Sequence, residues 1–152
     1  ARGIIICGET GSGKTTLADQ LVHKLHNIDT VTWLNADIIR SKYNDWDFSL
    51  EGRKRQVRRL NVLSHATDTN YVLCDFIAPT TEIRNTFDAD YTVWMDTITE
   101  GRFTDTNALF VKPTVYNYRI TSFDINHIDN ILSIVTGSNK NFDILESIQA
   151  SE

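Results

Sequence analysis

Two kinds of hydrophobic pattern alternate along this chain of 152 residues. The first is a short run of apolar or β-branched residues, which is typical of a buried strand. Ile4, Ile5 and Ile6 begin the first such run. Runs of this kind predict strands at residues 4–7, 31–35, 71–75, 91–96 and 118–121.

The second pattern is an amphipathic stretch with helical spacing, which separates one predicted strand from the next. Four apolar residues predict a helix after the first strand: Leu17, Leu21, Val22 and Leu25. Further helices are predicted at about residues 50–66, 80–87 and 124–135. Pro79 is expected in the first turn of the helix at 80–87, and Gly137 is expected to end the helix at 124–135. Strands that alternate with helices form a parallel sheet with helices on both faces, so the pattern predicts a three-layer α/β/α fold.

The predicted helix at about 50–66 carries a basic residue within its apolar stripe. Ser49 is expected to cap its N-terminus. The stripe consists of Arg53, Gln56, Val57, Leu60 and Leu63. Because a buried guanidinium needs an anionic partner, Arg53 should meet either a substrate anion or a protein carboxylate. The remaining basic residues of this segment are interpreted as a solvated face: Lys54, Arg55, Arg58 and Arg59.

A phosphate-binding motif lies between the first predicted strand and the first predicted helix. Residues 8–15 read GETGSGKT and fit the pattern G-x-x-x-x-G-K-[ST]. Glycines let backbone N–H groups turn inward around a polyphosphate, and the following helix N-terminus adds about half a positive charge. Lys14 is expected to reach the β- and γ-phosphates of ATP, and the Thr15 hydroxyl to bind Mg²⁺. The predicted ATP-binding residues are Gly8, Glu9, Thr10, Gly11, Ser12, Gly13, Lys14, Thr15 and Thr16.

Polar residues also gather where two predicted strands end, at the edge of the sheet where ligands bind in such folds. Asp37 and Arg40 follow the strand at 31–35, three residues apart on a predicted helical turn, so both can face the same way. A loop is predicted at residues 41–48. Asp75 ends the strand at 71–75, where an acidic residue can hold Mg²⁺ through a water. The sequence leaves open whether Asp37 or Asp75 handles the metal.

Composition narrows the class of protein further. The length and a hydrophobic content of 41% fit one domain that spans residues 1–152. A net charge of −5 and a pI near 5.3 disfavour nucleic acid as a partner. Cys7 and Cys74 both fall in predicted buried strands, so we interpret them as core residues in a reducing compartment. Nothing resembles a signal peptide or a membrane span, and we expect a cytoplasmic protein.

Several motifs of this chain resemble, in order, those of the adenylylsulfate (APS) kinase family. Besides GETGSGKTT at 8–16, they are LNADIIR at 34–40, FSLEGR at 48–53, FIAP at 76–79 and MDT at 95–97. The family motifs that they resemble are L-D-G-D-x-x-R, F-S-x-x-D-R, F-I-S-P and V-D-T-P, so Asn35 replaces the first Asp. Those enzymes use MgATP to phosphorylate the 3′-hydroxyl of adenosine 5′-phosphosulfate (APS), giving PAPS. The resemblance covers about residues 3–97 and implies a P-loop nucleotide-kinase fold.

The resemblance also implies roles for individual residues. Asp37 would be the general base on the acceptor hydroxyl, with Lys14 as the catalytic cation. The implied acceptor-binding residues are Arg40, Phe48, Arg53, Gln56, Ile77, Ala78 and Phe110. In this set the arginines and the backbone at 77–78 would hold the phosphosulfate, and Phe48 would stack on the acceptor adenine. Gln56 replaces an asparagine of the family, and Phe110 would supply a second stacking ring. Arg84 matches a downstream arginine, and a homodimer is compatible with the family.

Residues at about 97–112 would form the lid that closes over the phosphates in this fold. Members of the family carry R-D-P-K-G-L-Y in their lid, and this chain has no such motif. Its cations there are Arg102 and Lys112, which would stabilise the transferring phosphoryl group. Two alternatives stay open: a P-loop kinase for another nucleoside, nucleotide or polynucleotide 5′-hydroxyl, and a nucleotide-binding module without catalysis. A tail at about 138–152, with a short helix at about 142–148, is expected to follow.

Overall fold

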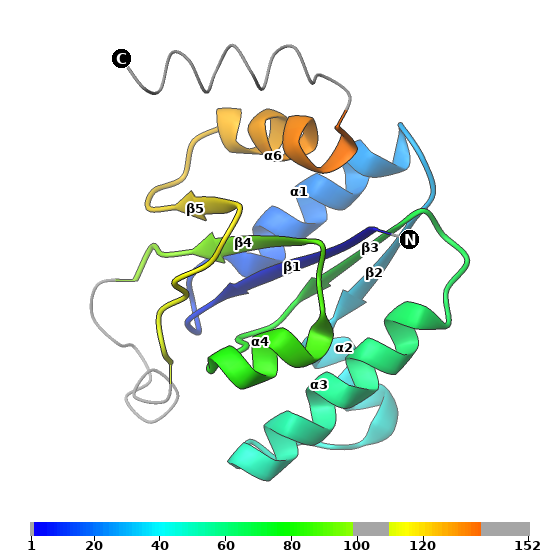
Figure 1. Cartoon of the computed structure of the whole chain (residues 1–152), viewed down its shortest axis with the longest axis vertical. Helices are drawn as coiled ribbons and strands as arrows, with labels where there is room; N and C mark the ends of the chain where they lie inside the picture. The colour runs from blue at the N-terminus through cyan, green and yellow to red at the C-terminus, as the bar shows by residue number, and fades with distance from the viewer. Residues whose placement is uncertain (1, 99–109, 138–152) are drawn as a thin grey trace.

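The computed structural model describes residues 2–98 and 110–137. Its centre is a five-stranded sheet with all strands parallel, in the order β2-β3-β1-β4-β5 (Figure 1). The strands are β1 (Arg2–Gly8), β2 (Val31–Asn35), β3 (Tyr71–Asp75), β4 (Tyr91–Met95) and β5 (Tyr118–Ile120). Each strand predicted from the hydrophobic pattern is therefore confirmed, with ends that differ by two residues or fewer.

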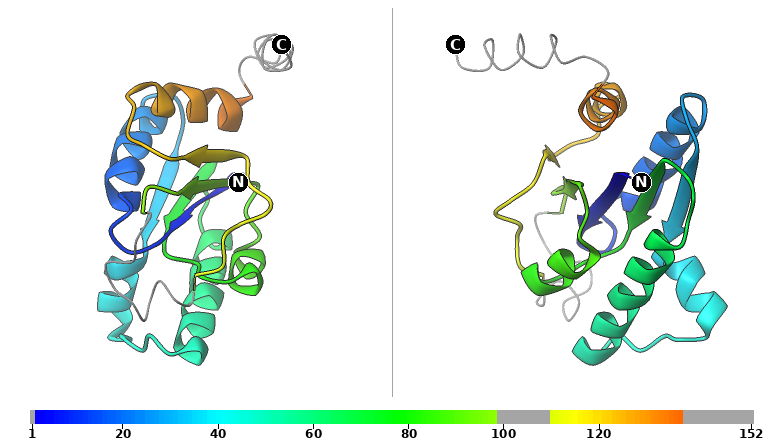
Figure 2. Two further views of the ribbon diagram at one scale, coloured as in Figure 1. Left: turned by 90° about the vertical axis from the view of Figure 1, so that its left-hand side faces the viewer. Right: turned by 45° about the vertical axis from the view of Figure 1, so that its right-hand side comes forward.

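Helices cover both faces of this sheet (Figures 1 and 2). They are α1 (Lys14–His26), α2 (Ala36–Tyr43), α3 (Leu50–His65), α4 (Thr81–Phe87) and α6 (Asn126–Thr136). Helices α1 and α6 pack on one face, and α3 and α4 pack on the other. In β1, Ile4 and Ile6 point into the core under α1 and α6, whereas Ile5 and Cys7 point into the opposite core. This is the three-layer α/β/α architecture that the sequence predicts.

The order of the strands locates the ligand crevice. From β1 the chain adds β2 and β3 on one side of the sheet and β4 and β5 on the other, so the winding reverses beside β1. Open parallel sheets bind ligands outside the carboxyl ends of their strands at such a reversal. The phosphate-binding loop leaves the end of β1 at this point, and Asn35 and Asp75 end β2 and β3 side by side.

Helix ends follow the capping chemistry of the sequence. The Ser49 side chain accepts a hydrogen bond from the Gly52 N–H and caps α3, as predicted. Gly137 ends α6 with φ 57°, a left-handed conformation that glycine adopts without strain. Thr80 caps α4, so Pro79 precedes the cap and the expectation that it occupies the first helical turn is wrong.

One further element is longer than the sequence predicts. A helical turn was expected at 37–40 and a loop from residue 41, but α2 continues to Tyr43 and ends at Asn44 with φ 50°. Asn35 caps the start of α2, since its Oδ1 accepts the Ile38 N–H at 3.0 Å. Most of the expected lid, including Arg102, and the whole tail at 138–152 lie outside the described residues. In the described part of the chain, no helix is long and apolar enough to cross a membrane.

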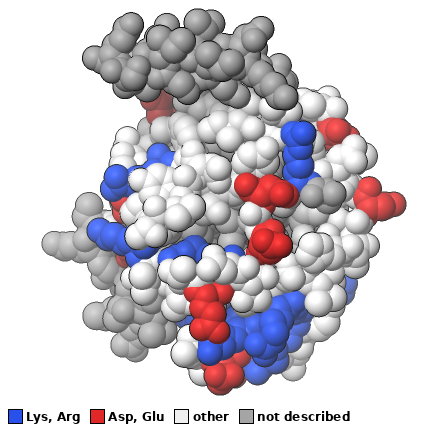
Figure 3. All heavy atoms as spheres, viewed as in Figure 1, with Lys and Arg blue, Asp and Glu red and all other residues white. Residues whose placement is uncertain are grey.

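The basic run of α3 lies largely at the surface (Figure 3). Carboxylates accompany several of its charges: Lys54 lies 3.8 Å from both Glu51 and Glu82, and Arg55 pairs with Asp45 at 2.7 Å. Mixed charge of this kind is a solvated protein surface and offers no continuous track for a polyanion. The structure agrees with the interpretation of a solvated face for Arg55 and Arg58, whereas Lys54 and Arg59 are half-buried and Arg59 pairs with Asp45 at 2.9 Å.

Candidate functional site

The phosphate-binding loop has the geometry of an anion cradle. Gly8 allows a close approach, because a Cβ there would lie 2.6 Å from the Met95 carbonyl oxygen. Gly13 adopts φ 99° immediately before α1, and no side chain caps that helix. The first N–H groups of α1 therefore remain available to a bound anion, which the helix dipole also favours.

Lys14 stands at the start of α1 with its ammonium group turned over the loop. Its Nζ donates to the Glu9 carbonyl oxygen at 2.9 Å. Burial lowers the pKa of Lys14 to about 8, although the nearby Asp75 carboxylate acts in the opposite direction. A phosphate group would supply the negative charge that this buried ammonium lacks.

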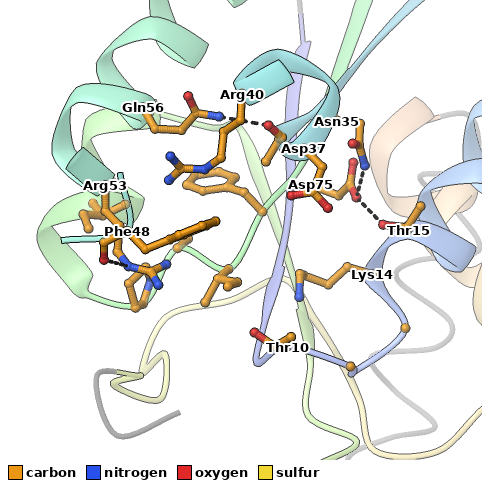
Figure 4. Close-up of a pocket in the computed structure, with 18 of the residues that line it drawn as sticks. Thr10, Lys14, Thr15, Asn35, Asp37, Arg40, Phe48, Arg53, Gln56 and Asp75 are labelled. Atoms are coloured by element: carbon orange, nitrogen blue, oxygen red, sulfur yellow. Dashed lines mark hydrogen bonds between the residues drawn. The ribbon is translucent and has the colours of Figure 1, made fainter. Parts of the chain in front are cut away.

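Asp75 lies at the end of β3, with an exposed fraction of 3%. Its carboxylate accepts three hydrogen bonds from neutral donors, Trp33 Nε1 at 2.7 Å, Asn35 Nδ2 at 3.0 Å and Thr15 Oγ1 at 3.0 Å. Burial raises the pKa of Asp75, and these hydrogen bonds partly oppose the shift. Asp75 is therefore held rigidly beside the threonine hydroxyl of the loop (Figure 4).

The roles of Trp33 and Asn35 were missed from the sequence. Asn35 could have been found, because it ends the strand beside Asp75 and a polar residue there meets its neighbour across the ladder. Its side chain both caps α2 and donates to Asp75. Trp33 carries no comparable signal, since a tryptophan in a strand usually serves the core.

Asp37 lies in the first turn of α2, exposed to solvent and at the wall of the cavity. In the described residues its carboxylate makes no ion pair or side-chain hydrogen bond within the limits of normal geometry. It is therefore available to a ligand, unlike Asp75, whose oxygens are already engaged. Figure 4 shows both carboxyl groups facing the same space as Lys14.

Two buried arginines stand across the cavity from the loop. Arg40 and Arg53 have exposed fractions of 4% and 7%. Arg40 Nη1 donates to the carbonyl oxygens of Asp45 and Asp47, at 3.0 and 3.2 Å, and Arg53 Nε donates to that of Phe48 at 2.9 Å. Within the described chain, neither guanidinium has a carboxylate oxygen within 4 Å. Of the two partners considered for Arg53, the protein carboxylate is thus not found among these residues.

Burial has a consistent electrostatic effect on this pair. It lowers the pKa of both Arg40 and Arg53, and for Arg53 the like charge of Arg40 adds to the effect. The Phe48 ring lies against both cations, 4.5 Å from the Arg40 guanidinium carbon and 5.4 Å from that of Arg53. The shift at Arg40 is opposed by three nearby carboxylates, those of Asp45, Asp37 and Asp47. None of the described carboxylates lies within ion-pair distance of either guanidinium, so the two buried groups favour the binding of an anion.

Gln56 lines the same cavity, but both ends of its amide are engaged by the protein. Nε2 donates to the Ala36 carbonyl oxygen at 3.0 Å, and Oε1 accepts from Arg59 Nη1 at 2.8 Å. The side chain thus ties α3 to the turn that begins α2. In this arrangement Gln56 shapes the wall beside Asp37 and has one remaining lone pair for a ligand.

The remaining wall comes from the segment after β3. Ala78 is buried and adopts φ 47°, a left-handed conformation that costs a non-glycine residue about 1 kcal/mol. Ile77 and Ala78 both line the cavity. In the described part of the chain, neither of their N–H groups donates to an acceptor. Two backbone donors are thus left for a bound anion.

These groups enclose one cavity of about 680 Å³. Its lining unites the phosphate-binding loop with Asp37, Arg40, Phe48, Arg53, Gln56, Asp75, Ile77 and Ala78 (Figure 4). Phe110 is not part of this lining: its ring packs against the adjoining core, 5.7 Å from the Arg84 guanidinium carbon. Lys112 is exposed and also lies outside the lining. The structure therefore brings together most residues predicted from the sequence and separates these two from them.

The fold and this site define a class of protein. A parallel sheet with the strand order given above, a phosphate-binding loop after the central strand and a second anion-binding subsite opposite it are typical of P-loop kinase-like proteins. Residues 2–111 match the family model of adenylylsulphate kinase. The chain belongs to the adenylylsulphate kinase family. No curated protein matches it in sequence.

Solved structures agree on the fold. The Mycobacterium tuberculosis APS kinase, solved in complex with AMPPNP and APS, is 20% identical, with a TM-score of 0.76 over 90% of this chain and 98% of that chain. A gluconokinase from Sinorhizobium meliloti 1021 is 11% identical, with a TM-score of 0.66 over 95% of this chain and 97% of that chain. A hexameric APS kinase from Thiobacillus denitrificans is 24% identical, with a TM-score of 0.63 over 86% of this chain and 28% of that chain.

Proposed function

We propose that this protein transfers the γ-phosphoryl group of ATP to the 3′-hydroxyl of adenosine 5′-phosphosulfate, giving PAPS and ADP. The observation that carries the proposal is the cavity itself. It has a phosphate-binding loop on one side and the buried arginines Arg40 and Arg53 on the other, with the carboxylate of Asp37 beside them. Such a cavity suits two anionic nucleotides that meet at one hydroxyl.

The donor half would hold the triphosphate. The free N–H groups at the start of α1 and the Lys14 ammonium group would contact its phosphates and offset the charge that develops in transfer. The expected Mg²⁺ fits this half, because Thr15 Oγ1 and Asp75 Oδ2 are oxygen ligands 3.0 Å apart. Bound there, Mg²⁺ would supply charge neutralisation to the phosphate oxygens. Between the two candidate acids, the contact with Thr15 favours Asp75 for the metal.

The acceptor half would hold the phosphosulfate. Its negative charge fits Arg40, Arg53 and the two free N–H groups of Ile77 and Ala78. Phe48 has an exposed fraction of 48%, and its ring forms part of the cavity wall. An exposed ring that is already fixed by two cations offers a flat platform for the acceptor adenine.

Asp37 would act on the acceptor hydroxyl. It would accept the hydroxyl proton as the 3′ oxygen bonds to the γ-phosphorus, while the bond from that phosphorus to the bridging oxygen breaks and ADP leaves. Its free carboxylate at the start of α2 supports this role. Of the two lid cations expected from the sequence, Lys112 lies outside the cavity lining, so Arg102, which falls outside the described residues, would complete the charge around the transferring group within a single kinase domain of residues 1–152.

The proposal is tested by a panel of acceptors in a coupled ADP-release assay: APS, adenosine, AMP, a 5′-hydroxyl oligonucleotide and gluconate, the last because of the structural likeness reported above. We expect APS to give the highest kcat/KM, and Asp37→Asn to lower kcat by about 10²-fold or more with little change in ATP affinity. A higher kcat/KM for another acceptor would overturn the acceptor assignment. ATP binding without any turnover would favour a non-catalytic module.

Asp75→Asn is the matched control for Asp37→Asn in the same experiment. Because Asp75 contacts Thr15, its variant should weaken ATP binding in Mg²⁺ while leaving nucleotide binding in EDTA nearly unchanged. The Asp37 variant should preserve the difference between the two conditions. The reverse pattern would assign the metal to Asp37.

A further inference from the structure

Arg84, on α4, joins two segments of the cavity wall from behind. Its Nη1 donates to the Ala78 carbonyl oxygen at 2.7 Å, and its Nη2 donates to the Val111 carbonyl oxygen at 2.8 Å. The two acceptors are 33 residues apart in the sequence. Arg84 itself does not line the cavity.

The charge of Arg84 is engaged only by neutral groups. Within the described chain it has no carboxylate oxygen within 4 Å, and its other contacts are the Thr81 hydroxyl and the Phe110 ring. Burial lowers the pKa of Arg84, and the electrostatic interaction with Cys7 opposes this shift. A charged donor makes about twice as strong a hydrogen bond as a neutral one, so both carbonyl contacts are strong.

The first contact stabilises a strained turn. Ala78 holds a left-handed conformation that an alanine ordinarily avoids, and the direction of its carbonyl depends on that conformation. The same turn presents the free N–H groups of Ile77 and Ala78 to the acceptor half of the cavity. The Ala78 carbonyl oxygen belongs to the peptide group with Pro79, which has no N–H, so Arg84 acts through Ala78 itself: fixing its carbonyl restrains the φ and ψ angles that orient the Ala78 N–H and the preceding peptide group.

The second contact anchors the segment Phe110–Val111. The Val111 N–H donates to the Pro79 carbonyl oxygen at 2.6 Å, so Val111 is bonded on both its backbone groups. The Phe110 ring lies beside the same guanidinium. Arg84 thus sets the spacing between the Ala78–Pro79 turn and the Phe110–Val111 segment with one rigid fork of donors.

We propose that Arg84 is a positioning residue for the acceptor: it holds the backbone donors at Ile77 and Ala78 in the orientation that binds the acceptor anion, and touches neither substrate. The identity of the acceptor rests on the function proposed above. The action of Arg84 on the backbone is independent of the proposed function, because it follows from hydrogen bonds within the protein.

Substitutions that separate charge from geometry test this role. Arg84→Lys keeps the charge but loses the fork, and Arg84→Gln keeps one donor group but loses the charge. We expect both to raise the KM for APS about tenfold, with the KM for ATP unchanged. Arg58→Gln, at an exposed arginine on α3, is the control and should change neither constant. Equal effects on both KM values, or on neither, would overturn the proposal.

Chemical rescue tests the fork more directly. In Arg84→Ala, millimolar guanidinium should restore much of the lost acceptor affinity by occupying the space between the two carbonyl oxygens, and should leave the wild type unchanged. A purely structural loss of stability would not respond in this way. Absence of rescue in a variant that is folded by circular dichroism would contradict the fork.

A measurement without substrate keeps this proposal separate from the proposed function. Amide hydrogen exchange at Val111 should be faster in Arg84→Gln than in the wild type, because the partner of its carbonyl is lost. If the wild type does not phosphorylate APS but Val111 responds in this way, the proposed acceptor fails while the action of Arg84 on the backbone stands. Unchanged exchange at Val111 would overturn the role of Arg84, whichever acceptor is used.

Discussion

Buried charges dominate this protein at the scale of single residues. Lys14, Arg40 and Arg53 are cations whose pKa values burial lowers, and Asp75 is an acid whose pKa burial raises. In each case the protein disfavours the charged form, which is typical of groups kept for a ligand. Binding of a polyphosphate would favour the charged form of all three cations, and Lys14 is the one whose pKa lies near neutrality, so ligand affinity should depend on pH.

Lys14 makes this dependence measurable. With a pKa of about 8, it is about half deprotonated at pH 8 in the free protein, and bound ATP should protonate it. We therefore expect ATP binding at pH 8 to take up protons, and its affinity to fall up to about tenfold between pH 8 and 9. Calorimetry in two buffers of different ionisation enthalpy measures the uptake.

The control for this prediction is Lys14→Arg, since a guanidinium does not titrate in this range and should show no such uptake. The same group affects stability. Its folded pKa of about 8 lies below the unfolded value of 10.5, so its contribution to the free energy of unfolding rises from pH 8 to 10.5. Binding at pH 8 without proton uptake in the wild type would contradict the lowered pKa.

At the scale of the element, packing between Gly52 and Asp47 determines which residue fits the start of α3, more than helix propensity does. Gly52 lies in the first turn of α3, where a Cβ would come within 2.2 Å of the Asp47 carbonyl oxygen. Asp47 in turn accepts the Ser49 N–H at 3.0 Å. This packing holds the loop that carries Phe48 against the helix that carries Arg53. A change at Gly52 should therefore affect both the stability of α3 and the acceptor half of the cavity.

In Gly52→Ala, helix propensity and packing change the free energy of unfolding in opposite directions. Helix propensity alone favours alanine by about 0.5–1 kcal/mol, whereas overpacking against a backbone atom costs about 1–3 kcal/mol. We expect the clash to win and the free energy of unfolding to fall by about 1–2 kcal/mol, measured by urea denaturation. Val62→Ala, at an exposed position of the same helix, should stay within about 0.5 kcal/mol of the wild type. A stabilised Gly52 variant would mean that Asp47 moves away freely.

At the scale of the whole molecule, two free cysteines lie in the core between the sheet and helices α3 and α4. Cys7 in β1 and Cys74 in β3 have no exposed surface. Burial raises the pKa of Cys7 to about 11 and that of Cys74 well above its ordinary value. Neither thiol is ionised or accessible in the folded protein, so labelling of either one requires the central sheet to open.

Thiol labelling therefore measures the opening of the entire fold. We expect a thiol reagent at pH 8 to label both cysteines slowly in the native protein and rapidly in urea. ATP at 100 times its dissociation constant should slow native labelling about 100-fold, because binding stabilises the folded state by mass action. Labelling that ATP does not slow would show that the thiols are reached through a local opening.

Much of the site could be predicted because its signals are local in the sequence. Residues 8–15 contain the whole phosphate-binding motif. Position at or after the carboxyl end of a predicted strand identified Asp37, Arg40 and Asp75. The periodicity of α3 placed Arg53 on the inner face, where it is buried. Each inference needs only the conformation of a few neighbouring residues, and apolar spacing determines that conformation.

Tertiary structure decided how these residues are used. Three sets of contacts join residues 20 or more positions apart: the hydrogen bonds of Trp33 and Asn35 to Asp75, the bond from Gln56 to Ala36, and the packing of the Phe110 ring beside Arg84. Such contacts depend on strand register and on the packing of α3 and α4 against the sheet, which no local pattern encodes. By itself, the sequence determined the three-layer fold and the phosphate-binding loop. Only the assembled sheet decided which acid meets Thr15 and which arginines remain free for an anion.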